Sequence, residues 1–185
     1  MLTIQQKLDK IIPRLSEKDF LENKGLANEV GIHVFCYDPS EEMVVTHFID
    51  KLKTEKNLPF RLIEKDLYKL FLQICEEKRV LSAIPAMEEK KGKDFILTHL
   101  QNMATPEAFA ARINDQPHGR GDILLLTGIG KVYPFMRSHK ILDNIQHHFS
   151  DIPVLMMYPG TFDGKSLGLF GKFLDGHYYR AFNLL

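Results

Sequence analysis

The chain has 185 residues, enough for one domain with a sizeable buried core. Its 24 basic and 24 acidic residues cancel, which argues against a broad nucleic-acid-binding face, although a local basic patch is compatible with that balance. No window has the length and apolar character of a membrane span or a signal peptide, so we expect a cytoplasmic protein with no membrane contact. The two cysteines, Cys36 and Cys75, lie in apolar segments and are expected to be reduced.

Residues 1–24 are expected to be helical. Apolar residues at helical spacing from Ile4 to Leu15 predict an amphipathic helix, which Pro13 could end early. Ser16–Asp19 resembles a capping box and predicts a second, short helix through Leu21.

The core, residues 30–185, is predicted to begin with a strand over Gly31–Tyr37. Asp38-Pro39-Ser40 then forms a turn, with Ser40 as the N-cap of a helix that contains Val45 to Leu52. A second strand follows at Phe60–Glu64, which makes a βαβ unit with a right-handed crossover.

The next segment is expected to be mostly helical. Leu67 to Ile74 has clean helical spacing, and Thr105-Pro106 is a strong helix start, with threonine as the N-cap and proline in the first turn. Gln116–Gly121 is a loop.

A second βαβ unit follows. Ile123–Leu126 is a short, continuous apolar run, which predicts a strand that is buried on both faces. Gly128 and Gly130 turn the chain into a helix from Val132 to Phe149, with His139 on its apolar face. A second buried strand spans Ile152–Tyr158.

The C-terminal region begins with the glycine-rich segment Pro159–Ser166. A short helical piece at Leu167–Phe170, a turn at Asp175-Gly176 and a last strand at His177–Leu185 are expected after it. The whole pattern predicts a single three-layer α/β domain, with a mainly parallel sheet of about five strands flanked by helices.

Two glycine motifs suggest nucleotide binding, and both are incomplete. Pro159 stands where a P-loop has its first glycine before Gly164-Lys165-Ser166, and no acidic strand end follows to hold magnesium. Gly128 and Gly130 lack the third glycine of a dinucleotide fingerprint, because Tyr133 stands in its place. We favour rigid turns, with a P-loop-like fold that has no working P-loop as the alternative.

The spacing of the eight histidines nominates no metal site, and the chain contains no nucleophile beside a base, so neither a cofactor nor catalytic residues are expected. Parallel sheets bind ligands and partners at the carboxyl ends of their strands, although turn-forming residues are common there in any case. The candidate residues at that edge are Asp38, Gly128, Gly130, Lys131, Pro159, Gly160, Asp163 and Gly164.

Three blocks resemble the BrxB family, whose members are small components of BREX bacteriophage-resistance systems. The blocks are Thr127–His139 with Leu142–Asn144, Pro159–Gly164 with Leu167–Phe170, and Tyr178–Phe182. The resemblance implies a cytoplasmic bacterial or archaeal protein without an established catalytic activity. It further implies that the protein acts together with a methyltransferase, a large ATPase and a PglZ-type protein of the alkaline-phosphatase superfamily. The recurrent family residues match here at Gly128, Gly130, Tyr133, Pro134, Arg137, Ser138, His139, Pro159, Gly160, Asp163, Gly164, Tyr179 and Arg180.

The leading hypothesis is therefore a non-enzymatic assembly subunit that acts by protein–protein interaction, first of all with the PglZ-type component. The candidate partner-binding residues are Tyr133, Arg137, Ser138, His139 and Arg180. Tyr133 and Arg137, four residues apart, are expected to share one helix surface, unless Arg137 instead pairs with Asp163 and pins the glycine-rich loop.

Two alternatives remain open. One is a degenerate nucleotide-binding protein. The other is a DNA-contacting accessory factor that uses Lys131, Arg137 and Lys140.

Overall fold

A computed structural model describes residues 2–23, 31–174 and 179–185. The strands are β1 (Ile32–Tyr37), β2 (Arg61–Asp66), β3 (Asp122–Thr127), β4 (Val154–Phe162), β5 (Leu167–Leu169), β6 (Phe173–Leu174) and β7 (Phe182–Asn183). The helices are α1 (Ile4–Leu8), α2 (Ile11–Leu15), α3 (Lys18–Leu21), α4 (Glu42–Thr54), α5 (Leu67–Glu77), α6 (Ile84–Lys91), α7 (Lys93–Met103), α8 (Pro106–Ile113), α9 (Ile129–Val132) and α10 (Ser138–Ile145), with short 3-10 turns η1 (Pro39–Glu41) and η2 (Leu81–Ala83).

The sheet has five parallel strands in the order β2-β3-β4-β1-β7, which confirms the predicted mainly parallel sheet. Leu124 pairs with Val154 and Leu125 with Leu155, so the two apolar runs are neighbours as predicted. β1 and β2 are parallel but not adjacent, because β3 and β4 lie between them. The crossover through α4 therefore spans two strands.

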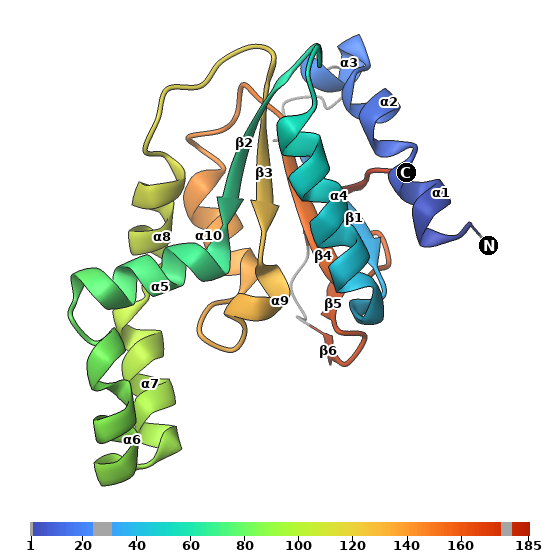
Figure 1. Cartoon of the computed structure of the whole chain (residues 1–185). Coiled ribbons are helices and arrows are strands. Elements are labelled where there is room, and N and C mark those ends of the chain that lie inside the picture. The colour runs from blue at the N-terminus through green and yellow to red at the C-terminus, as the bar shows by residue number, and fades with distance from the viewer. Residues whose placement is uncertain (1, 24–30, 175–178) are drawn as a thin grey trace.

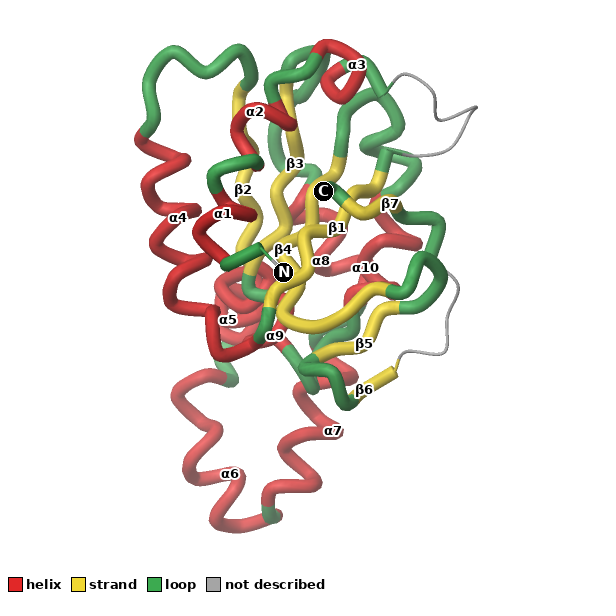
Figure 2. The backbone as a smooth tube through the Cα atoms, turned by 90° about the vertical axis from the view of Figure 1, so that its right-hand side faces the viewer, coloured by secondary structure: helices red, strands yellow, loops and turns green. Residues whose placement is uncertain are grey.

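Two apolar clusters, one on each face of the sheet, form the three-layer α/β fold that the sequence predicts. Alternation along the strands divides the side chains, so that Leu124 and Leu126 face one cluster and Leu125 faces the other. Helices α1–α4 cover one face, and α5 and α7–α10 contribute to the other (Figure 1). The hairpin of α6 and α7 projects away from the sheet in both views (Figures 1 and 2). No helix in the described ranges is long and apolar enough to cross a bilayer.

The N-terminal helices differ in detail from the prediction. The helix breaks at Asp9–Lys10 and not at Pro13, which lies inside α2. Proline is tolerated there because first-turn N–H groups have no partner within the helix. The expected capping box at Ser16 is also absent: its hydroxyl donates to the Ile12 carbonyl, and α3 begins only at Lys18.

The N-cap after β1 is Asp38, and the prediction of Ser40 is wrong. An Asp38 carboxylate oxygen accepts the Ser40 backbone N–H at 2.9 Å, and Pro39 occupies the first position of η1. A carboxylate is the stronger acceptor of the two side chains, which explains the choice. The predicted cap at Thr105 is confirmed, since its hydroxyl accepts from the Ala108 N–H.

The predicted long helix from Val132 to Phe149 is wrong. α9 ends at Val132, and α10 begins only at Ser138. Pro134 accounts for the interruption, because a proline disfavours helical geometry in the residue before it and lacks the N–H that a helix interior needs.

The glycine-rich segment forms a β-hairpin and not a strand, loop and helix. β4 runs on through Phe162 and pairs in antiparallel fashion with β5, so the predicted helical piece at Leu167–Phe170 is wrong. A Cβ on Gly160 would lie 2.1 Å from the Gly168 carbonyl oxygen, so only glycine allows the backbones to approach this closely. Asp163 closes the turn by accepting the N–H groups of Lys165 and Ser166. The segment is therefore a glycine-rich turn, as predicted, and the structure shows no P-loop in this described segment.

The last strand is shorter than predicted. β7 contains only Phe182 and Asn183, which pair with His33 and Val34 of β1. The expected turn at Asp175-Gly176 and the first two residues of the predicted strand lie outside the described residues.

Candidate interaction site

Four apolar side chains and one arginine form a surface cluster at the hairpin end of the sheet. This hairpin patch consists of Tyr133, Arg137, Phe170 and Phe173, which contact one another, together with the exposed Leu174, whose side chain lies against Gly168. The ring centroids of Tyr133 and Phe173 are 5.0 Å apart, and Phe170 meets both rings edge-on. Phe173 is 40% exposed and Leu174 is 76% exposed. Large apolar side chains that gather on a surface mark interaction sites more often than scattered ones do.

Small residues bring the elements of the patch together. A Cβ on Gly130 would lie 2.9 Å from both the Phe170 ring and the Pro159 ring. The glycine therefore leaves the space that the Phe170 ring occupies. Gly128, two residues earlier, allows a similarly close approach, because it lies against the Asp66 side chain, which caps α5. The two glycine blocks of the sequence thus meet in space.

Arg137 covers the ring of Tyr133. Its guanidinium carbon lies 5.9 Å from the ring centroid, within the range of a cation–π contact. The expected proximity of the two side chains is confirmed, but its predicted cause is wrong. They are brought together by the extended loop between α9 and α10, not by one helix face.

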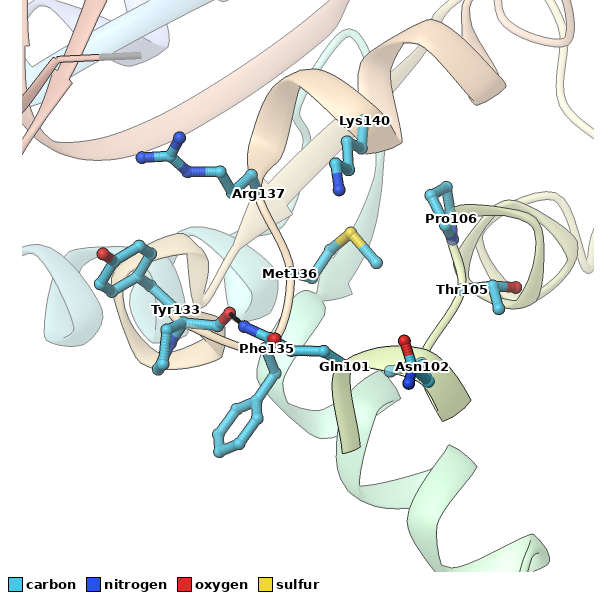
Figure 3. A pocket seen from close by; sticks show the side chains of 11 residues that line it. Gln101, Asn102, Thr105, Pro106, Tyr133, Phe135, Met136, Arg137 and Lys140 are labelled. Atoms are coloured by element: carbon cyan, nitrogen blue, oxygen red, sulfur yellow. Dashed lines mark hydrogen bonds between the residues drawn. The ribbon is translucent and has the colours of Figure 1, made fainter. Parts of the chain in front are cut away.

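A pocket of about 490 Å³ adjoins the patch (Figure 3). Its walls come from the end of α7, the start of α8 and the α9–α10 loop, and the residues are Gln101, Asn102, Ala104, Thr105, Pro106, Tyr133, Pro134, Phe135, Met136, Arg137 and Lys140. The Gln101 side chain donates to the Pro134 carbonyl at 2.9 Å and ties α7 to the loop. The Phe135 ring stacks on Phe71 of α5 at 4.4 Å, which anchors the loop to the core.

Only part of the other predicted partner-binding set lies near the patch. Ser138 lines a small pocket with Tyr133, Arg137 and Phe173, but it is buried at the start of α10. His139 and Arg180 line a separate pocket of about 300 Å³, together with Asp143 and Tyr179. The five predicted residues therefore do not form one surface.

The carboxyl edge of β1–β3 is a cleft with internally paired polar groups. The Lys131 ammonium lies 3.4 Å from the Glu42 carboxylate, which also accepts a 2.6 Å hydrogen bond from Tyr37. Burial, followed by this bond to Glu42, raises the pKa of the Tyr37 hydroxyl. Lys53 pairs with Glu64 at 2.7 Å in the same cleft.

The remaining predicted edge residues have structural roles or lie in the hairpin. Hydrogen bonds from Ser40 lower the pKa of Asp38, and backbone N–H groups of Ser166 and Lys165 lower the pKa of Asp163. Gly164 takes a positive φ of 90° in the hairpin turn. Within the described ranges, no three potential ligand side chains are close enough to hold a metal ion.

Sequence reasoning missed Phe170, Phe173 and Leu174. The signal was an apolar run around Gly171 with no helical period long enough to bury it. A strand was the better interpretation of so short a segment.

Comparison with known proteins gives consistent matches. The family model described as "BREX protein BrxB" matches residues 63–184, which is more than half of the chain. The chain belongs to the BrxB family. A BREX protein BrxB from Bacillus cereus (strain H3081.97) is 43% identical over 195 residues, covering 100% of this chain and 99% of the relative. A second, from Escherichia coli O9:H4 (strain HS), is 26% identical over 183 residues, covering 98% of this chain and 92% of the relative. No solved structure matches.

The family-model match begins at residue 63 and does not cover the N-terminal third of the chain. The segment 63–184 contains the whole hairpin patch and the adjoining pocket, whereas Asp38, Glu42 and the N-terminal helices lie before it. This surface therefore lies within the part of the chain that the family model covers.

Proposed function

We propose that the chain is a non-catalytic assembly subunit of a BREX phage-defence complex and docks on another protein through the hairpin patch. The carrying observation is the exposure of Phe173 and Leu174 beside a tyrosine that is capped by Arg137. Aromatic and arginine side chains are enriched at the centres of protein interfaces. Family membership supports a BREX context, and the PglZ-type component is the partner we propose first.

The positions of the other candidate residues also favour docking over chemistry. Lys165 and Ser166, which suggested a P-loop, lie in a hairpin turn whose backbone N–H groups already bind Asp163. The loop between β1 and α4 carries Asp38 and Glu41, and α4 begins with Glu42; these acidic side chains would repel a phosphate.

DNA contact is less well supported. Lys131 lies in the cleft beside Glu42, whereas Arg137 and Lys140 line the pocket by the patch. The three cations do not form the continuous strip that phosphate binding needs.

Co-purification tests the proposal. We expect the double variant Phe173→Ser and Leu174→Ser to lose the co-expressed PglZ-type component while keeping its melting temperature. Arg120→Ala is the matched control, because Arg120 is an exposed arginine in the loop before β3, at the opposite end of that strand. Retention of the PglZ-type component and of every other BREX component by the double variant would refute docking through this patch.

A further inference from the structure

Two basic residues line the pocket beside the hairpin patch. Among the described residues that line it are Arg137 and Lys140 but no aspartate or glutamate, although the chain has 24 acidic residues. Lys140 is exposed, and no carboxylate of the described residues forms an ion pair with its ammonium. Figure 3 shows the Lys140 side chain directed into the pocket above Met136. The charge therefore favours an anionic occupant.

The walls of the pocket favour a protein segment over a free phosphate. Phosphate sites use backbone N–H groups, often from glycines, but Pro106 and Pro134 have no N–H, and no described glycine lines the pocket. The Thr105 hydroxyl is already bonded to the Ala108 N–H. One wall is apolar, because Met136 supplies thioether and methyl surface and Pro134 supplies its ring.

We propose that this pocket receives an acidic segment of the partner protein. One carboxylate of the segment binds the Lys140 ammonium, and an adjacent apolar side chain packs against Pro134 and Met136. This inference rests on the proposed docking function and names the partner chemistry at the same surface. The segment continues from the pocket onto the hairpin patch, because Tyr133 and Arg137 belong to both.

A charge series at Lys140 tests the inference. The dissociation constant of the purified PglZ-type subunit is measured for wild type, Lys140→Glu and Lys140→Arg at several salt concentrations. We expect Lys140→Glu to weaken binding about tenfold or more, since it places like charges together, and Lys140→Arg to stay within about threefold. Lys93→Glu is the control, because Lys93 is also exposed, at the start of α7.

The outcomes separate the inference from the proposed function. If Lys140→Glu binds like wild type while the Phe173 and Leu174 double variant does not, the acidic-segment inference is wrong and docking through the patch stands. If neither variant weakens binding, both fail. If Lys140→Glu keeps the subunit but loses a fluorescent DNA duplex that wild type binds, the pocket binds phosphates, and the inference is again overturned.

Discussion

The buried strands and the hairpin patch put similar side chains to opposite uses. Leu125 in β3 is 0% exposed and pairs with Leu155, whereas Leu174 in β6 is 76% exposed. Burial of apolar area stabilises a fold by about 25 cal/mol per Å², so Leu125 contributes to folding and Leu174 contributes little. An apolar side chain that folding does not use is available for binding. The comparison predicts that mutations will separate stability from docking.

The largest effect is expected from a charge in the sheet. Leu125→Asp buries an unpaired carboxylate and should lower the free energy of unfolding by at least about 4 kcal/mol. Leu174→Asp, its matched control on the patch, should change stability by no more than about 0.5 kcal/mol. Urea titration measures both, and equal stabilities would show that the strand assignment is wrong.

The buried side chain of His33 should make the stability of the core depend on pH. It is 5% exposed between Phe20 and Phe182, and burial, with a smaller contribution from Arg14, lowers its pKa from 6.5 to about 4. Between these values the unfolded chain binds more protons than the folded one. The contribution of the neutral His33 to the free energy of unfolding is therefore fully present above pH 6.5. It falls by up to about 3 kcal/mol as the pH approaches 4.

A variant isolates the contribution of His33. His33→Gln should remove this component of the pH dependence, as followed by chemical unfolding at pH 7 and pH 4.5. The same slope in the variant would assign the dependence to other groups.

The close approach of the Gly160 and Gly168 backbones in the hairpin should contribute less to the free energy of unfolding. Gly160→Ala places a methyl group against the Gly168 carbonyl and should cost about 1–3 kcal/mol. Gly119→Ala is the control, because nothing lies within 4 Å of its added Cβ. Thermal melting compares the two variants, and an unaffected Gly160→Ala would mean that the hairpin opens at low cost.

The smallest effect is expected at Lys165. Lys165→Ala removes a side chain from an exposed turn whose backbone bonds remain, so stability should change by less than about 0.5 kcal/mol. We also expect no ATP turnover by the wild-type protein. Turnover that disappears in Lys165→Ala would restore the P-loop hypothesis.

The parallel core was predictable because its signal is local. Runs such as Ile123–Leu126 and Ile152–Tyr158 are continuous, apolar and bounded by turn residues, so both strands and their pairing followed. The hairpin was not predictable in the same way. Leu167–Phe170 is too short for its periodicity to distinguish strand from helix, and its pairing with β4 depends on the contact between Gly160 and Gly168.

The site was only partly predictable for the same reason. Tyr133 and Arg137 were identified together, but the periodic pattern concealed the break that Pro134 makes. His139 and Arg180 were grouped with them although they line a different pocket. Adjacency in the sequence gave no information about which side of α10 His139 faces, and Arg180 comes from the segment before β7.

Docking through the hairpin patch is tested most directly with the Arg137→Ala variant. Titration calorimetry gives its dissociation constant for the purified PglZ-type subunit, and the melting temperature is measured on the same sample. If Arg137 is an interface residue, its loss should weaken binding by about 1–4 kcal/mol, or roughly 5- to 1,000-fold, with a melting temperature within about 2 °C of wild type. A large fall in melting temperature with an unchanged dissociation constant would contradict this interface role and would make Arg137 a structural clamp of the glycine-rich hairpin.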